Sequence, residues 1–556
     1  MPALLLVIII VVVILLVLGL STGGSQNKKL AKIRERWGKP IVANRRFNLI
    51  SAYLDNCDDN YISNNTAADL DLDDLFEYLD RTNSRPGQQY LYKQLHMSAV
   101  SETYLDKLEQ QIAHVNRDKE LRELAELKLS DLNNSNAYYL PGLFSKLQQP
   151  LFNPLLKAYI SMAPFLTVGF IISLIIRLNQ YSFVLLLIMV IANVGIHFLN
   201  KMKTLGYTPS LPQLLILYKV GDWLAEKKLL ENTDDVKNSL NHVAKLKRSL
   251  SFINLQSKID SDPTDVSFLI TEWFKILLLL EPFMFIISID RVNKYLADIK
   301  TLYEAVARVD MAIAIQSVRE GALYYCKPKF TTDRDNILIK DLYHPLIDNC
   351  VPNSISIDNK QGVLITGSNM SGKTTFIRAA AINAIVAQTI NTSFARGYSS
   401  PPLQIHTSIN MSDDLGESKS YFQAEALSIK TIIDDVKSGH PINSLVIIDE
   451  IFRGTNTIER VAAAKAVLSY FIKNKGFVFV STHDLELAEL LGEDYKVFSF
   501  EEIMGDDQLI FDYKIKEGLL KNKNGIAVLQ RLGYPETIID EANKLSIQLR
   551  AKYDLN

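Results

Sequence analysis

A glycine-bounded polar loop follows an apolar run at residues 362–366. The loop reads Gly367, Ser368, Asn369, Met370, Ser371, Gly372, Lys373 and Thr374, which matches G-x-x-x-x-G-K-[ST], and Thr375 opens a helical pattern to residue 388. The two glycines permit a tight turn whose backbone N–H groups point at phosphate oxygens. Lys373 adds a positive charge for the β and γ phosphates, and the Thr374 hydroxyl is a ligand for Mg²⁺. The pattern therefore predicts a binding site for ATP and Mg²⁺ at residues 367–375.

Two adjacent acids end a second apolar run, residues 444–448. They are Asp449 and Glu450. A buried strand that delivers two carboxylates to its end suits phosphoryl transfer to water: Asp449 would hold the Mg²⁺ shell, and Glu450 would polarise the attacking water. Together with the phosphate loop, these acids predict an ATP-hydrolysing site.

A histidine follows a third apolar run, residues 476–481. His483 lies in the string Thr482-His483-Asp484. In a parallel sheet the strand ends meet at one edge, which would place His483 near the γ-phosphate. We expect it to contact or sense that phosphate, as a third catalytic residue beside Glu450 and Lys373.

The elements around these motifs divide the chain into regions of different texture. From about residue 331 to 556, short β-rich runs alternate with helical stretches, which is typical of an α/β domain with a largely parallel sheet. Residues 25–157 and 201–330 show apolar side chains at helical spacing and few strand signals. We therefore expect an α + α/β multidomain protein with a helical core in two parts.

The first residues form an apolar run without charge, from 2 to 20. A run of ~18 such residues is long enough to cross a bilayer as a helix, so residues 1–24 are predicted to be a transmembrane anchor. A cleaved signal peptide is the alternative, but no Lys or Arg precedes the run. Six basic residues follow it between Lys28 and Lys39, which places this side in the cytoplasm and the N-terminus outside.

A second apolar region, residues 158–200, consists of two pieces, 159–176 and 181–199, separated by four residues. Each piece is just long enough to span a membrane, so a helical hairpin is predicted. Lysines at 157, 201 and 203 place both outer ends on the cytoplasmic side. A third apolar run, 276–287, contains Glu281 and Pro282 and is too short to span; we expect a buried helix there. The predicted location is a multi-pass inner, or cytoplasmic, membrane protein with its α/β domain in the cytoplasm.

Several strings resemble the MutS family of DNA mismatch repair ATPases. They are TGSNMSGKTT, IIDEIFRGTNTIER, STHDLELAEL and FDYKIKEG followed by NGIAVLQRLGYPETIIDEANKL. Upstream, residues 75–95 resemble the helix that enters the family's core, and residues 306–320 resemble the lever helix that leads to its ATPase domain. The resemblance implies an ABC-type P-loop ATPase domain.

The resemblance also implies a dimer with composite ATP sites. Ser420 matches the family's signature serine, which reaches the γ-phosphate bound by the partner subunit. Tyr513 stands where the family usually has a histidine that packs on adenine, and its ring could still stack on the base. The family's other adenine-stacking aromatic residue is missing here, because the stretch after His344-Pro345 offers only Val351 and Pro352.

The chain also departs from a mismatch-reading MutS. It passes from the predicted anchor almost directly into core-like helices, without the mismatch-reading and connector domains, and the predicted hairpin falls near where the family inserts its DNA clamp. The 60 Lys and Arg against 62 Asp and Glu leave a net charge of −2, which supplies no global excess for phosphate neutralisation. Three widely spaced cysteines support neither a disulfide framework nor a Cys-rich metal site.

Two functions remain open at this point. The first is a membrane-anchored MutS-like ATPase that binds DNA in a mismatch-repair-related process and uses ATP to drive clamp or lever movement. The second is an ATP-driven membrane machine that acts on a membrane protein or lipid partner without recognising DNA. Three predicted spans and the absence of an L-S-G-G-Q string argue against an ABC exporter.

Overall fold

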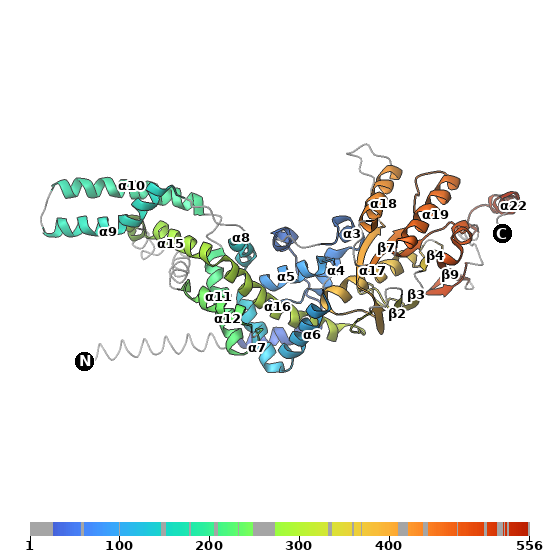
Figure 1. Cartoon of the computed structure of the whole chain (residues 1–556), viewed down its shortest axis with the longest axis horizontal. Coiled ribbons are helices and arrows are strands. Elements are labelled where there is room, and N and C mark those ends of the chain that lie inside the picture. The colour runs from blue at the N-terminus through green and yellow to red at the C-terminus, as the bar shows by residue number, and fades with distance from the viewer. Residues whose placement is uncertain are drawn as a thin grey trace. The chain divides into compact units, whose positions relative to one another are not determined.

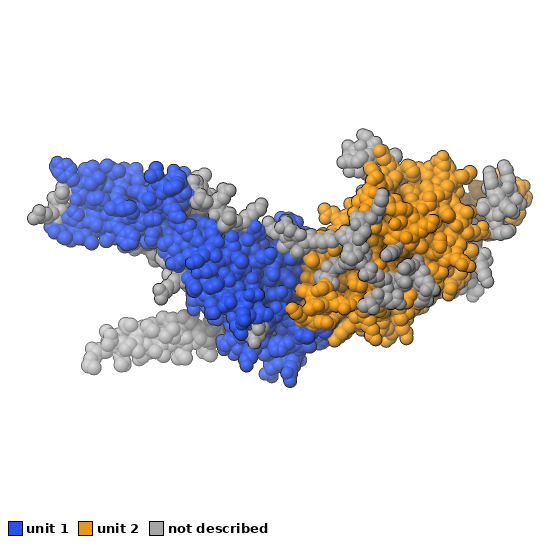
Figure 2. Space-filling model, in the orientation of Figure 1, with its two compact units in different colours: residues 1–58, 79–93, 109–321 blue, residues 59–78, 94–108, 322–556 orange. Residues whose placement is uncertain are grey.

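The chain folds into two compact units that alternate along the sequence. The computed structural model describes residues 26–56, 61–98, 101–145, 152–176, 180–204, 210–231, 233–247, 273–331, 336–357, 361–368, 370–409, 421–437, 443–474, 476–504, 509–519, 526, 529–530 and 533–553. Unit 1 comprises residues 1–58, 79–93 and 109–321, and unit 2 comprises residues 59–78, 94–108 and 322–556 (Figure 2). The predicted anchor, residues 1–24, lies outside the described residues.

The elements of unit 1 are helices (Figure 1). Its shorter elements are α2 (Phe47–Ile50), η1 (Ser51–Asn56), α7 (Lys119–Leu129), η2 (Ser130–Leu132), η3 (Ser135–Tyr139), α8 (Pro141–Phe144), α11 (Ser210–Glu226) and α12 (Asp234–Ala244). Two further helices, α5 (Arg85–His96) and α6 (Glu102–Val115), have residues in both units. The apolar spacing predicted this helical texture correctly.

The longest helix, α16 (Leu296–Gly321), forms the centre of unit 1 and contains the predicted lever helix, residues 306–320. It packs against α11 and α12, and almost every side chain from Ile299 to Arg319 is buried. Its Asp310 is fully buried and accepts hydrogen bonds from the backbone N–H groups of Asn83 and Ser84 and from the Ser84 hydroxyl. Burial raises the pKa of Asp310 to about 6, although these hydrogen bonds lower it.

The contact with Asp310 explains a difference from the sequence expectation. Residues 75–95 were predicted as one helix, but the structure has α4 (Leu72–Leu79) and α5, separated at residues 80–84. The backbone N–H groups of Asn83 and Ser84 bind the Asp310 carboxylate at 2.7–3.0 Å instead of helix carbonyls. Pro86, which has no N–H group, then fits the first turn of α5.

The two predicted spans form the antiparallel hairpin of α9 (Pro154–Ile176) and α10 (Gln180–Thr204), which lie side by side in Figure 1. Only 17% and 28% of their apolar windows are buried. Both helices are long and apolar enough to cross a membrane. The side chain of Asn193 is fully buried, accepts from the Tyr159 hydroxyl at 2.8 Å and donates to the Leu277 carbonyl at 2.8 Å. Asn193 is therefore a structural link between the hairpin and the segment at residue 277.

The third apolar run differs from the continuous buried helix expected at residues 276–287. The helix that includes residues 273–278 is interrupted at Leu279, whose φ is +45°, and α15 (Leu280–Lys294) begins after it. Pro282 lies in the first turn of α15, where its missing N–H group costs no hydrogen bond. Phe285, Ile289 and Val292 are buried, whereas Trp273 and Phe274 are exposed.

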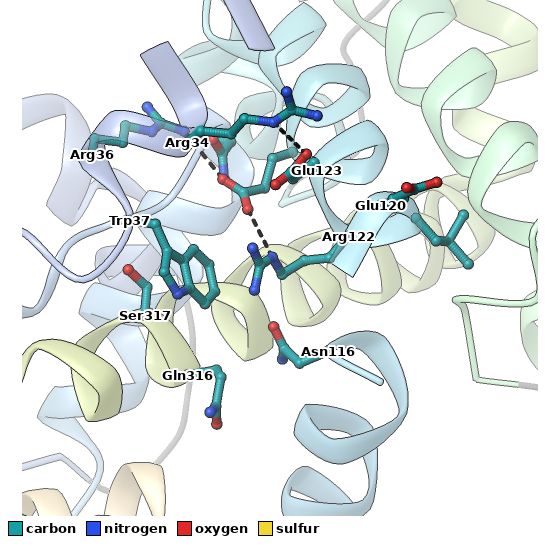
Figure 3. Close-up of polar contacts among 12 residues, drawn as sticks. Arg34, Arg36, Trp37, Asn116, Glu120, Arg122, Glu123, Gln316 and Ser317 are labelled. Atoms are coloured by element: carbon teal, nitrogen blue, oxygen red, sulfur yellow. Dashed lines mark hydrogen bonds and ion pairs between the residues drawn. The ribbon is translucent and has the colours of Figure 1, made fainter. Parts of the chain in front are cut away.

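An N-terminal segment, residues 26–46, binds α7 and the end of α16; we call it the N-terminal clasp (Figure 3). Arg34 Nε donates to Glu123 at 2.7 Å, and Trp37 Nε1 donates to Glu320 at 2.5 Å. The Gly38 backbone N–H donates to the Ser317 hydroxyl at 3.1 Å. These bonds join the chain directly after the predicted anchor to the last turn of the lever helix.

Unit 2 contains two sheets. The six-stranded sheet has the order β10-β9-β4-β8-β7-β6, in which β10 alone is antiparallel to its neighbour, and the four-stranded sheet has the order β1-β5-β2-β3. The strands are β1 (Lys329–Phe330), β2 (Ile337–Leu342), β3 (Asn353–Ile357), β4 (Gly362–Gly367), β5 (Gly397–Ser400), β6 (Leu403–Ser408), β7 (Asn443–Asp449), β8 (Gly476–Ser481), β9 (Tyr495–Met504) and β10 (Leu509–Glu517). A largely parallel sheet was predicted, and this architecture has one.

Helix α17 (Lys373–Ile390) contacts strands of both sheets, β2 in the smaller and β4, β6, β7 and β8 in the larger. Nearly every side chain from Phe376 to Ile390 is buried. The alanines among them permit this close packing because their side chains are small. The larger sheet also packs against α18 (Tyr421–Lys437), α19 (Thr457–Lys473) and α20 (Glu486–Leu491) through a core that includes Val446, Val478 and Leu468. The unit also contains η4 (Gly492–Asp494), α22 (Glu536–Tyr553), α3 (Asn64–Asp69) and all of α4 except Leu79.

The limits of unit 2 differ from the expected boundary at residue 331. The unit resumes at Ala322, and it includes residues 59–78 and 94–108. Specific polar contacts explain why the earlier segment belongs to it: the Asp69 carboxylate accepts from the Thr407 hydroxyl at 2.7 Å and from the Ile409 backbone N–H at 2.9 Å. Such long-range pairs are not visible in the spacing of one sequence.

Candidate functional site

The predicted phosphate loop connects β4 to α17. Its turn requires left-handed backbone at three positions, Gly367 (φ +147°), Met370 (φ +68°) and Gly372 (φ +106°), and glycine occupies two of them. The Lys373 side chain is 5% exposed, and its ammonium donates to the carbonyls of Gly367 at 2.9 Å and Ser368 at 2.7 Å. A cation held over a loop in this way is suited to a phosphate group. Asn369 lies outside the described residues.

Thr374 and Asp449 lie in contact, as expected for two residues that share one Mg²⁺. The Thr374 hydroxyl donates to Asp449 Oδ2 at 2.7 Å, and the Ser481 hydroxyl donates to Oδ1. Neighbouring parallel strands produce this arrangement, because Asp449 at the end of β7 is in register with Ser481 at the end of β8. A hydroxyl and a carboxylate oxygen are hard oxygen ligands, which fit Mg²⁺ bound together with nucleotide phosphates.

Glu450 follows β7 in a left-handed conformation, with φ +55°. Its carboxylate forms ion pairs with His483 Nε2 at 2.9 Å and with Arg453 Nε at 2.5 Å. Burial raises the pKa of Glu450, but the hydrogen bonds and charges of His483 and Arg453 outweigh it and leave the pKa below its ordinary value. The residue is therefore ionised at neutral pH, the form that accepts a proton.

His483 was predicted to face the γ-phosphate, and the structure places it against Glu450 at the end of β8. The loop that holds it is fixed on both sides: the Thr482 N–H donates to the Ile365 carbonyl at 3.0 Å, and Asp484 binds Arg460 through two bonds of 2.6 and 2.9 Å. His483 is thus within reach of the same reacting region as Glu450.

Tyr513 lies beside the phosphate loop, where a Cβ on Gly372 would be 3.3 Å from its ring. Its backbone carbonyl accepts from the Asn353 side chain at 2.9 Å, and its side chain is 44% exposed, so one ring face is open to a ligand. Sequence reasoning did not identify Asn353, which also accepts from the Ile515 N–H at 2.9 Å. Its signal was weak, because an asparagine at a strand start has many structural roles.

These residues surround one cavity of about 510 Å³. Its walls include Val351, one of the two small residues found in place of the family's second adenine-stacking aromatic residue. The full lining is Leu342, Tyr343, His344, Ile347, Asp348, Asn349, Cys350, Val351, Asn353, Ser368, Met370, Ser371, Gly372, Lys373, Thr374, Thr375, Phe376, Ala379, Glu450, Arg453, Phe500 and Tyr513. Burial, together with the charge of Arg378, lowers the pKa of His344 to about 4, so the His344 side chain is neutral at pH 7. The size suits a small organic ligand.

One further site prediction is not visible in this geometry, and one residue of the site was not predicted. Ser420, the predicted signature serine, lies outside the described residues, and α18 begins at the next residue. Arg453 was not singled out from the sequence, although it lies three residues after Glu450 in the string IFRGT and pairs with it. Arginine at this spacing from an acid was the signal that could have found it.

A mostly parallel sheet with a phosphate loop between β4 and α17, and acids at the end of β7, defines a P-loop nucleotide-binding domain. Residues 363–550 match the family described as MutS domain V, an ATPase domain. Over these residues the chain is similar to the MutS family.

Curated relatives share only part of their length with this chain. The DNA mismatch repair protein MutS of Lactobacillus acidophilus is 33% identical over 287 residues, 49% of this chain and 33% of the relative. The protein of the same name from Methanosarcina barkeri is 31% identical over 285 residues, 49% of this chain and 31% of the relative. The chain thus spans about a third of the length of the curated relatives it matches.

Proposed function

We propose that this protein is a membrane-anchored ATPase that hydrolyses ATP with Mg²⁺ in the cavity of unit 2. One observation carries the proposal: Lys373, Thr374 and Glu450, from two motifs far apart in the sequence, line one cavity, and Asp449 accepts a hydrogen bond from Thr374. The similarity to MutS proteins supports the same activity, because members of this family are ATPases.

In this proposal each residue has one role. The loop from Gly367 to Thr375 binds the phosphates, Lys373 neutralises β and γ charge, and Thr374 and Asp449 hold Mg²⁺. Glu450 accepts a proton from the attacking water, and His483 contacts and stabilises the γ-phosphate. Tyr513 stacks on the base. Glu450 binds Arg453 and His483 before ATP arrives, so substrate binding must exchange at least one of these partners for water.

We also propose a homodimer in which Ser420 of each subunit reaches the γ-phosphate of the other. The support is the family's composite site and the position of Ser420 directly before α18. ATP binding would then close the dimer, and α16, which ends where unit 2 resumes, would carry the movement into unit 1.

A membrane location is the next part of the proposal. The α9–α10 hairpin exposes large apolar side chains, among them Phe165, Ile175 and Ile191, and basic residues flank both outer ends. Residues 1–24 add the predicted anchor, with the N-terminus outside and the ATPase unit in the cytoplasm. We expect the full chain to stay with the membrane fraction after alkaline carbonate washing; its release would contradict the transmembrane assignment.

The curated relatives are named for DNA mismatch repair, which supports a DNA-directed ATPase as the first candidate function. The second candidate, an ATP-driven machine for a membrane protein or lipid, is favoured by the apolar hairpin. These two functions differ in whether DNA changes ATP turnover.

The decisive experiment uses the full chain purified in detergent. ATP turnover is measured alone and with homoduplex, mismatched and branched DNA, at low and physiological salt, because phosphate-driven binding weakens steeply with salt. Glu450→Gln, prepared in parallel, measures contaminating ATPase. Stimulation by one DNA form at physiological salt supports the DNA-directed function. Turnover that no DNA alters favours the membrane function, and turnover equal to that of Glu450→Gln contradicts both.

A further inference from the structure

A buried acid outside the predicted motifs binds the turn that carries Glu450. Glu425 lies near the start of α18 and is 3% exposed. Its Oε1 accepts a hydrogen bond from the Phe452 backbone N–H. The acid therefore binds a backbone N–H group of the turn after β7.

This turn needs support because its backbone is strained. Glu450 has φ +55° and Phe452 has φ +61°, and the left-handed region is unfavourable for a non-glycine residue. Conformations of this kind persist only where their surroundings hold them. Here the N–H group that Glu425 binds belongs to Phe452, one of the two strained residues.

The start of α18 packs against the same turn. The rings of Phe422 and Phe452 lie 5.8 Å apart, and a Cβ on Gly454 would come within 2.9 Å of the Phe422 side chain. The turn is thus fixed to α18 on two sides, by an apolar contact and by a carboxylate.

We infer that Glu425 is a positioning residue that sets the orientation of Glu450 for hydrolysis by holding the 450–453 turn against α18. The inference rests on the proposed ATPase function. Helix α18 begins one residue after Ser420 in the sequence.

The oxygen of Glu425 accepts a hydrogen bond from the buried backbone of the turn, which an apolar side chain could not do. Without it, the N–H group of Phe452 would lose its buried partner, which favours a different turn. Among the described residues Glu425 Oε2 has no hydrogen-bond partner, so a single acceptor oxygen meets the requirement. A glutamine keeps that oxygen at the same reach, whereas an aspartate withdraws it by one methylene.

The test compares Glu425→Gln, Glu425→Asp and Asp434→Ala in the full chain in detergent. Asp434 is a matched control, because it is an exposed acid on the same helix that forms an ion pair with Lys430. We expect Glu425→Asp to lower the kcat of ATP hydrolysis at least tenfold with KM and ATP affinity within threefold of wild type. Glu425→Gln and Asp434→Ala should keep kcat within threefold.

The outcomes separate this inference from the proposed function. Unchanged kcat in Glu425→Asp, or a loss of ATP affinity equal to the loss of kcat, overturns the positioning role. A tenfold loss in Glu425→Gln as well also overturns it, because the acceptor oxygen is then not what matters. Thermal melting with and without Mg·ATP shows that each variant is folded. If the wild-type chain hydrolyses no ATP, the proposed function itself fails.

Discussion

The guanidinium group of Arg122 lies over the indole ring of Trp37, 3.5 Å from the ring centroid. This contact joins α7 to the N-terminal clasp (Figure 3), and the same indole donates its N–H to Glu320 in the last turn of α16. A cation over an aromatic face is worth ~0.5 to 2 kcal/mol. One tryptophan thus connects the segment that follows the predicted anchor with two helices of unit 1.

Beside this contact lies Glu126, a buried acid whose titration makes stability depend on pH. Burial raises the pKa of Glu126 from 4.5 to about 7, although Arg36 and Arg122 lower it. Between pH 4.5 and 7 the folded chain keeps a proton that the unfolded chain releases, so stability falls as the pH rises through this window.

Replacing Glu126 with glutamine should remove that loss. We expect Glu126→Gln to be more stable than wild type by about 3 kcal/mol at pH 8, with the difference fading toward pH 5. Thermal melting of the clasp region, followed by Trp37 fluorescence between pH 5 and 8, measures this. Equal pH dependence in both proteins would contradict the assignment of the titration to Glu126.

The clasp also predicts the effect of a single methyl group at Gly321. A Cβ there would lie 1.8 Å from the Gly38 carbonyl oxygen, so the clasp and the end of α16 must separate. We expect Gly321→Ala to cost about 1 to 3 kcal/mol of stability in unit 1, as overpacking does. Gly142→Ala is the control, because no atom lies within 4 Å of its added Cβ. Similar melting of the two variants would disprove the close approach.

Loss of the phosphate-loop cation should weaken nucleotide binding. A hydrogen bond from a charged group contributes ~1.5 to 3 kcal/mol, so Lys373→Ala is expected to lower ATP affinity about 10- to 100-fold. Lys430→Ala, an exposed lysine paired with Asp434, should leave affinity unchanged. Equilibrium binding of a fluorescent ATP analogue distinguishes them, and equal affinities would argue against the role of Lys373.

The proton acceptor should affect hydrolysis and not binding. General-base catalysis contributes ~100- to 10,000-fold, so Glu450→Gln is expected to bind ATP normally while its kcat falls at least about a hundredfold. With ATP the variant should also accumulate as a closed dimer, which light scattering detects. Normal turnover in Glu450→Gln would rule out the general-base role of Glu450.

Local sequence determined the elements of the nucleotide site. The glycines of the loop, the apolar runs that became β4, β7 and β8, and the acids after β7 are all properties of short segments. Such signals survive folding because strand and turn preferences act within a few residues. The apolar lengths of α9 and α10 were equally readable, since a span depends on a count of consecutive residues.

Tertiary structure alone decided which distant residues complete these elements. Asp310 divides the expected helix of residues 75–95, because its buried carboxylate attracts the N–H groups of Asn83 and Ser84. Asp69 binds the end of β6 and thereby places residues 59–78 in unit 2, and Glu425 supports the turn of Glu450. A buried polar group must find a partner wherever the fold supplies one. That partner is set by packing over hundreds of residues, which no local spacing in the sequence encodes.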